Sequence, residues 1–229
     1  MFWMETTISA TIKIISPDRK RTNLFRAPEQ STIAFLCRWM PTWISSDLLT
    51  FIGLLGSIIV FAGFFFAKFD NNYLALSIFG FAVQWFGDSL DGRIAYYRNI
   101  PRKWYGFSLD MSMDWISTIF IGLGFYFFLE ESYKVLAFTF VTAYAWTMLL
   151  ALLKYKITGN YAIDSGLFGP TELRIGICLV LLGAIFYPQT LTIFAVIINL
   201  FVYGLNCVEF YNVLQLGNAR DREENAKKK

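Results

Sequence analysis

Residues 88–114, DSLDGRIAYYRNIPRKWYGFSLDMSMD, hold four aspartates between long apolar runs. Asp88 and Asp91 are three residues apart, and Asp110 and Asp114 are four apart. Each pair therefore shares one face of its segment if that segment is helical. Ionised carboxylates among apolar segments are costly unless they are paired or bind a cation. We expect the four to bind a divalent metal, and oxygen ligands favour Mg²⁺, Mn²⁺ or Ca²⁺.

Phosphate chemistry suits such a site. Mg²⁺ keeps several waters and takes substrate phosphates as further ligands, and four carboxylates suffice for two ions that clamp a reacting phosphoryl group. The chain has no histidine, which excludes His-based acid–base catalysis and His metal ligands. Its three cysteines form no CxxC pair, so neither a zinc site nor a disulfide framework is indicated.

Composition predicts an integral membrane protein, because 56% of the 229 residues are hydrophobic and only 16% are charged. A span takes about 20 apolar residues. We predict an all-α six-transmembrane-helix bundle, with spans at residues 47–67, 73–96, 108–130, 133–154, 171–187 and 189–213. The two aspartate pairs lie near adjoining ends of the second and third spans, so they can meet at one depth.

The segment before the first span has the pattern of a helix that lies on the membrane surface. Ser31 is a candidate N-cap, Ile33 and Phe35 begin the apolar face, and Trp39 suits the headgroup region. An ordinary connector is the alternative. Residues 1–21 alternate apolar and polar types, which favours an extended segment followed by a basic one.

The positive charges predict the orientation. Of the 20 Lys and Arg, all but Lys68 and Lys134 fall on the side of the aspartates, so we expect the site and both termini to be cytoplasmic. The net charge of +3 is too small and dispersed to suggest nucleic acid. The basic excess fits anionic lipid headgroups or a phosphate substrate.

The spacing of the four aspartates resembles the signature of the CDP-alcohol phosphotransferase (CDP-alcohol phosphatidyltransferase) family, D-x2-D-G-x2-A-R followed by G-x3-D-x3-D. Gly92, Ala95 and Gly106 occupy the other signature positions. Two features depart from it: Tyr96 stands where the family has Arg, and the spacer before Gly106 is one residue longer than is common. Arg93, one turn earlier, is a candidate to replace the missing Arg.

The resemblance implies a metal-dependent enzyme of phospholipid synthesis that transfers a substituted phosphate from a CDP-linked donor to an alcohol, releasing CMP. It implies Mg²⁺ or Mn²⁺, two ions in all, and a homodimer. It assigns the four aspartates to the metal and Asp114 also to the proton of the acceptor hydroxyl. The CDP-binding residues it implies are Asp88, Gly92, Arg93, Ala95 and Gly106. The domain it predicts covers residues 29–215, between an extension, 1–28, and a disordered polar tail, 216–229.

The acceptor is harder to predict from the sequence. Thr50, Lys154 and Arg174 are candidates for the substrate pocket, although Lys154 and Arg174 could equally extend to the headgroups. Thr171 in "GPTELR" is a candidate helix cap, and Glu209 lies in the last span without an evident partner. We favour CDP-diacylglycerol as donor and a small polar alcohol as acceptor.

The sequence is compatible with three alternatives. In the first, the donor is CDP-ethanolamine or CDP-choline and the acceptor is a lipid alcohol. In the second, the protein is a divalent-cation transporter. In the third, suggested by Tyr96, it is an inactive relative of the family with a structural role. The expected position of the aspartates near one membrane face, rather than at the midplane, argues against transport.

Overall fold

The computed structural model describes residues 2–15, 25–159 and 169–227, and in these ranges all regular structure is helical, as predicted. The α-helices are α1 (Phe2–Ile15), α2 (Arg26–Trp39), α3 (Ser46–Ala67), α4 (Leu74–Tyr97), α5 (Lys103–Phe128), α6 (Val135–Thr158), α7 (Pro170–Phe186) and α8 (Gln189–Ala226). Two 3₁₀ turns, Asn71–Tyr73 and Glu131–Tyr133, precede α4 and α6.

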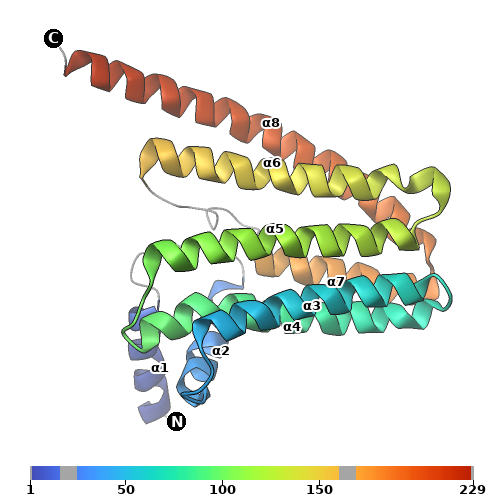
Figure 1. The fold of residues 1–229 in the computed structure, drawn as a ribbon, viewed down its shortest axis with the longest axis horizontal. Helices are drawn as coiled ribbons and strands as arrows, with labels where there is room; N and C mark the ends of the chain where they lie inside the picture. Colours follow the sequence, from blue (N-terminus) through green and yellow to red (C-terminus); the bar gives the residue numbers. More distant parts are fainter. Residues whose placement is uncertain (1, 16–24, 160–168, 228–229) are drawn as a thin grey trace.

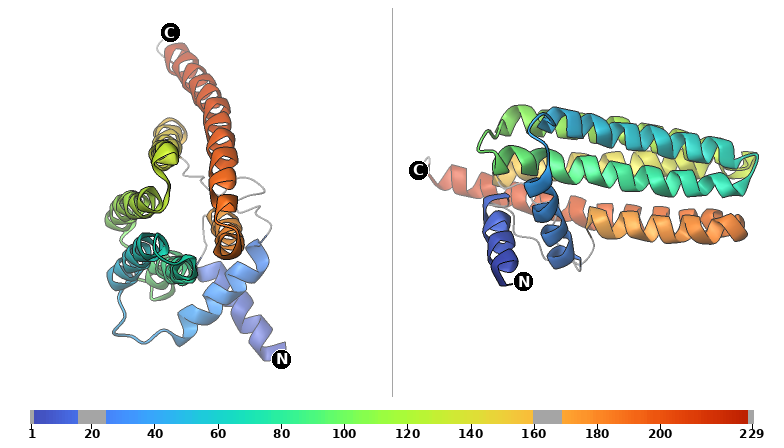
Figure 2. Two further views of the ribbon diagram at one scale, coloured as in Figure 1. Left: turned by 90° about the vertical axis from the view of Figure 1, so that its right-hand side faces the viewer. Right: turned by 90° about the horizontal axis from the view of Figure 1, so that it is seen from below.

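The helices α3 to α7 run side by side, α8 passes them obliquely and projects beyond them at its C-terminal end, and α1 and α2 cross at one end (Figures 1 and 2). At that end α3, α5 and α7 begin and α4 and α6 finish. We call it the motif end, because the aspartate motif of residues 88–114 lies there, and we call the opposite end the far end. Sequence neighbours in this set are antiparallel. The aspartates of α4 and α5 are therefore brought to the same end of the bundle.

Four helical segments are long and apolar enough to cross a membrane: Ser46–Ala67, Lys103–Phe128, Glu131–Thr158 and Gln189–Ala226. They correspond to α3, α5, α6 and α8. The other two predicted spans coincide with α4, which carries charged residues near its end, and α7, which has only 17 residues. Six crossings therefore remain a prediction, whereas four are supported by length and composition.

Glycines bring the backbones of α3 and α4 into direct contact. A Cβ atom added to Gly87 would lie 2.3 Å from the backbone nitrogen of Gly53, and one on Gly56 would lie 2.3 Å from that of Gln84. Small residues of this kind let membrane helices approach closely. Because these contacts leave no room for sliding, they set the position of Asp88 and its neighbours relative to α3.

A ladder of polar contacts joins α6 to α8. Thr142 and Tyr203 hydrogen-bond at 2.8 Å, and Thr147 donates to Asn206 at 2.9 Å. Nearer the motif end, Lys154 and Glu209 form an ion pair at 2.7 Å, which supplies the partner for Glu209 that the sequence left open. Hydrogen bonds between helices replace the hydrophobic driving force that lipid does not provide.

The predictions for the N-terminal region were wrong in two respects. Phe2–Ile15 forms the α-helix α1, not an extended segment, and Ile15 is buried against the bundle. The helix α2 begins at Arg26, so Ser31 lies inside it and does not cap it. The predicted basic segment lies mostly at residues 16–24, outside the described part of the chain.

The C-terminal region also differs from prediction. The polar tail was expected to be disordered, but α8 continues as one helix to Ala226. Arg220 donates to the backbone carbonyls of Lys156 and Ile157 at 2.9 and 2.7 Å. It thereby satisfies carbonyl groups at the end of α6 that have no partner within that helix.

Candidate functional site

Three aspartates converge at the motif end. Asp88 lies near the end of α4, and Asp110 and Asp114 lie near the start of α5. Each offers one carboxylate oxygen, and these oxygens all lie within 4.8 Å of one another. The arrangement results from the i, i+4 spacing on α5 and from the antiparallel packing of α4 beside it. Three like charges at this separation repel unless a cation neutralises them.

Asp91 lies on the α3 side of the same site. The Thr50 hydroxyl donates to its Oδ2 at 2.7 Å, the Gly92 amide donates to its other oxygen, and the Ser46 hydroxyl donates to its carbonyl at 2.8 Å. Asp91 as a whole is only 8% exposed. Thr50, a predicted pocket residue, thus orients the one aspartate that lies outside the group of three.

Arg174 reaches the cluster from the start of α7. Its guanidinium contacts the Asp88 carboxylate at 2.5 Å. This contact brings together two predicted site residues that are 86 positions apart. One guanidinium balances only one of the four carboxylate charges, so the site still favours further positive charge.

The start of α7 is held by Glu172, not by the predicted cap Thr171. Gly169 is the N-cap, and its amide donates to Glu172 at 3.0 Å. The other oxygen of Glu172 accepts from the Phe25 amide at 2.9 Å, at the start of α2. Thr171 instead donates to Glu29 of α2 at 2.9 Å. These contacts attach α2 to α7 two residues before Arg174.

The aspartates line a small cavity between α3, α4 and α5. Its walls consist of Thr50, Gly53, Leu54, Gln84, Asp88, Asp91, Asp110, Met113, Asp114 and Ser117. Gln84 and Ser117 were not among the residues predicted from the sequence. The available signal was their spacing, since each lies about one helical turn from an aspartate and so shares its face.

The two signature glycines differ from those between α3 and α4. A Cβ added to Gly92 or Gly106 would meet no atom within 4 Å. Both positions therefore border open space instead of another helix. Ala95, the other small signature residue, is half-buried near the end of α4.

The two remaining predicted cations lie outside the cavity lining. Arg93 is 4% exposed and acts electrostatically on Cys37 of α2, although burial dominates there and raises the pKa of the Cys37 thiol to about 11. Lys154 pairs with Glu209 between α6 and α8. Tyr96, at the position of the family Arg, is half-buried on α4.

The loop between α4 and α5 is bound to the segment between α2 and α3. Arg98 donates to the carbonyls of Ile44 and Pro41 at 2.5 and 2.7 Å, and Arg102 pairs with Asp47. The positive φ of 57° at Asn99 turns the chain back after α4. These arginines fix the loop that connects the two aspartate pairs, a role that sequence spacing alone does not reveal.

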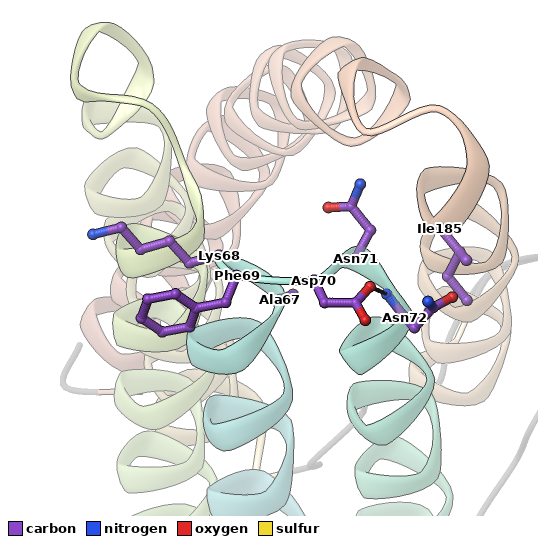
Figure 3. Close-up of a pocket in the computed structure, with 7 residues that line it drawn as sticks. All are labelled: Ala67, Lys68, Phe69, Asp70, Asn71, Asn72 and Ile185. Carbon is purple, nitrogen blue, oxygen red and sulfur yellow. Dashed lines mark hydrogen bonds between the residues drawn. The ribbon is translucent and has the colours of Figure 1, made fainter.

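A larger hollow lies at the far end (Figure 3). It measures about 490 Å³ and is lined by Ala67, Lys68, Phe69, Asp70, Asn71, Asn72 and Ile185. Its one carboxylate, Asp70, accepts from the Asn72 amide at 2.9 Å and so caps the turn before α4. Although this hollow is larger than the aspartate cavity, it is a weaker candidate for the functional site, because its charged side chains do not converge as the aspartates do.

Comparison with known proteins agrees with this geometry. The sequence model of the CDP-alcohol phosphatidyltransferase family matches residues 43–205, from just before α3 into α8. A search among curated proteins found no match. The family comprises membrane transferases of phospholipid biosynthesis, generally dependent on a divalent metal, that move a phosphate-linked group from a CDP-alcohol to an acceptor. With most of its length matched, this integral membrane protein belongs to the CDP-alcohol phosphatidyltransferase family.

Proposed function

We propose that the protein transfers a phosphatidyl group from CDP-diacylglycerol to the hydroxyl of a small polar alcohol, releasing CMP. The observation that carries the proposal is the convergence of Asp88, Asp110 and Asp114 at the motif end, with their oxygens within 4.8 Å. That cluster lies inside the matched family region. The compact chain favours this donor over one with a soluble headgroup.

The donor set fits a divalent cation. Asp88, Asp110 and Asp114 offer hard oxygen ligands from two helices, and Asp91 adds a fourth from the α3 side. Bound Mg²⁺ or Mn²⁺, two ions in this proposal, supplies positive charge that stabilises the phosphoryl oxygens and the leaving CMP. Thr50 keeps the Asp91 carboxylate turned toward the site.

Asp114 is the proposed general base. The acceptor hydroxyl loses its proton to the Asp114 carboxylate while its oxygen forms a bond to the β-phosphorus of the donor, the one that bears the diacylglycerol. The bond from that phosphorus to the oxygen of CMP breaks, and CMP leaves with the electron pair. A carboxylate suits this role in a chain without histidine.

The open space beside Gly92 and Gly106 supports a nucleotide site there, completed by Asp88, Ala95 and Arg93. Arg93 contributes only if it turns from its buried position. Arg174 is the stronger candidate for an acidic group on the acceptor, because it already lies at the aspartates. Lys154 is the weaker one, since it must first leave Glu209.

The proposed topology has six crossings with the motif end in the cytoplasm. The distribution of Lys and Arg supports the orientation. α4 and α7 run along the four apolar helices, which supports two further crossings (Figure 1). Exposed Trp39 and Trp43, at 74% and 75%, support the placement of α2 at the headgroup level. A homodimer rests on the family resemblance alone.

A CMP-release assay identifies the donor. Purified protein is incubated with Mg²⁺ or Mn²⁺ and with either CDP-diacylglycerol or CDP-ethanolamine, each tested against a panel of alcohols, and the CMP released is measured. We expect CMP with CDP-diacylglycerol and a small polar alcohol. CMP only from CDP-ethanolamine with diacylglycerol would assign the alternative direction of transfer. Cation flux into liposomes without CMP from any pair would favour transport and contradict the proposal.

A further inference from the structure

Four residues of the cavity lie about one helical turn farther from the motif end than the aspartates. We call them the cavity floor: Gly53, Leu54, Gln84 and Ser117. Gln84 precedes Asp88 by four residues on α4, and Ser117 follows Asp114 by three on α5. Because α4 and α5 are antiparallel, both steps lead away from the motif end and into the bundle (Figure 1).

Gln84 and Ser117 are buried polar residues that line the cavity. They are 7% and 4% exposed, and neither side chain forms a hydrogen bond within the described parts of the chain. The neighbouring Thr118, by contrast, donates to the Asp114 carbonyl of its own helix at 2.8 Å. Burying a polar group without a partner is costly. Since both residues line the cavity, its occupant is the expected partner.

The chemistry of the cavity floor indicates the kind of occupant. The Gln84 amide and the Ser117 hydroxyl are uncharged donors, and Leu54 beside them is apolar. They suit a neutral acceptor oxygen between a charged group at the aspartates and an apolar chain in the bundle. In a glycerolipid the ester carbonyls hold that place, between the polar end of the glycerol and the acyl chains.

We propose that Gln84 and Ser117 form a subsite that donates hydrogen bonds to an ester carbonyl of the glycerolipid substrate. The proposal rests on the proposed function, and either the CDP-diacylglycerol donor or a diacylglycerol acceptor supplies the same ester chemistry. The subsite places the glycerol so that its polar end meets Asp88 and Asp114. Gln84 and Ser117 are thus specificity-determining residues that contact the lipid away from the reacting atoms.

Lipid binding to the full chain in nanodiscs tests the subsite without a reaction, because the co-substrate is left out. One arm compares CDP-diacylglycerol with its diether analogue, and the other compares diacylglycerol with its diether analogue. We expect the diester to bind about tenfold tighter in one arm, the factor that a satisfied hydrogen bond contributes. That arm identifies the lipid source. Gln84→Met and Ser117→Ala should each reduce the preference while leaving diether affinity unchanged.

Ser57→Ala is the matched control, because Ser57 is fully buried on α3 and its hydroxyl donates to the Gly53 carbonyl of its own helix. Equal affinity for diester and diether in both arms would overturn the subsite. So would equal weakening of both lipids by Gln84→Met, the result expected if the residue holds a water molecule. CMP release is measured separately: ester preference without CMP contradicts the proposed function alone, and CMP without ester preference contradicts the subsite alone.

Discussion

At the residue scale, Asp114 is the carboxylate on which the proposed chemistry depends most. It lies with Asp88 and Asp110 in the group of three, and the proposal gives it the acceptor proton. We predict that Asp114→Asn lowers kcat for CMP release by about 10²–10⁴-fold, since the amide cannot accept that proton. Asp70→Asn, at the far-end turn, is the matched control and should keep kcat. Wild-type activity in Asp114→Asn would remove the residue from the mechanism.

We predict that Arg174 competes with a metal ion for Asp88. Their contact at 2.5 Å places a fixed positive charge where a cation would bind. Replacing the guanidinium by an amide should therefore raise the affinity of the substrate-free protein for Mn²⁺ by about tenfold. Electron paramagnetic resonance of free Mn²⁺ measures this directly. Lys154→Gln should leave the affinity unchanged, because Lys154 pairs with Glu209. Equal or weaker binding by Arg174→Gln would contradict the competition.

At the element scale, the contact between α3 and α4 sets the site. A Cβ on Gly56 would lie 2.3 Å from the Gln84 backbone, whereas one on Gly183 of α7 meets nothing within 4 Å. We expect Gly56→Ala to destabilise the protein by about 1–3 kcal/mol through overpacking. Gly183→Ala should be neutral or stabilising. Thermal unfolding in detergent compares them, and equal melting temperatures would argue against close backbone packing.

The packing of α2 against the bundle can be tested through Cys37. Cys37 is buried there, and burial raises the pKa of its thiol to about 11. The thiolate is the reactive form, so labelling at pH 8 should be slow and should rise as the pH approaches 11. In a chain with Cys37 as the single cysteine, Arg98→Lys should speed labelling, because it releases the segment before α3 while keeping the positive charge that lowers the pKa of the Cys37 thiol. Arg222→Lys, on the exposed tail of α8, should not. Fast labelling of the single-cysteine chain without either arginine substitution would contradict the burial of Cys37.

At the scale of the whole molecule, the topology determines which compartment supplies the substrates. Cysteines placed at Asn99, beside the motif end, and at Asn71, in the far-end turn, report on opposite ends of the bundle. In sealed cells an impermeant thiol reagent should label Asn71→Cys and spare Asn99→Cys, which becomes reactive only after the membrane is opened. The reverse pattern would place the aspartates outside.

Apolar run length and i, i+4 spacing predicted much of this architecture. The first predicted span, 47–67, nearly coincides with α3, and the convergence of α4 and α5 follows from antiparallel succession. The ends of the chain were harder. The helix α1 and the tail of α8 are stabilised by tertiary contacts, such as that of Arg220 with α6, which local patterns do not encode.

The contacts of the site were likewise only partly predictable. The two aspartate pairs follow from spacing, but the contact of Arg174 with Asp88 depends on where Glu172 anchors α7. Gln84 and Ser117 are uncharged polar residues, which also serve in contacts between membrane helices, and only their burial beside the aspartates distinguishes them. Such long-range contacts depend on how the whole chain folds, so local periodicity in the sequence does not predict them.

We propose that the aspartate cluster is a metal-dependent CDP-alcohol transferase site. The most direct measurement is CMP release by the purified protein from CDP-diacylglycerol with a panel of small polar alcohols, titrated with Mg²⁺ or Mn²⁺ after chelation. We predict no CMP without metal, saturable release on adding it, and no recovery in Asp110→Asn. Release unaffected by chelation or by Asp110→Asn, or no release under any condition from folded protein, would contradict a metal-dependent transferase site at the aspartates.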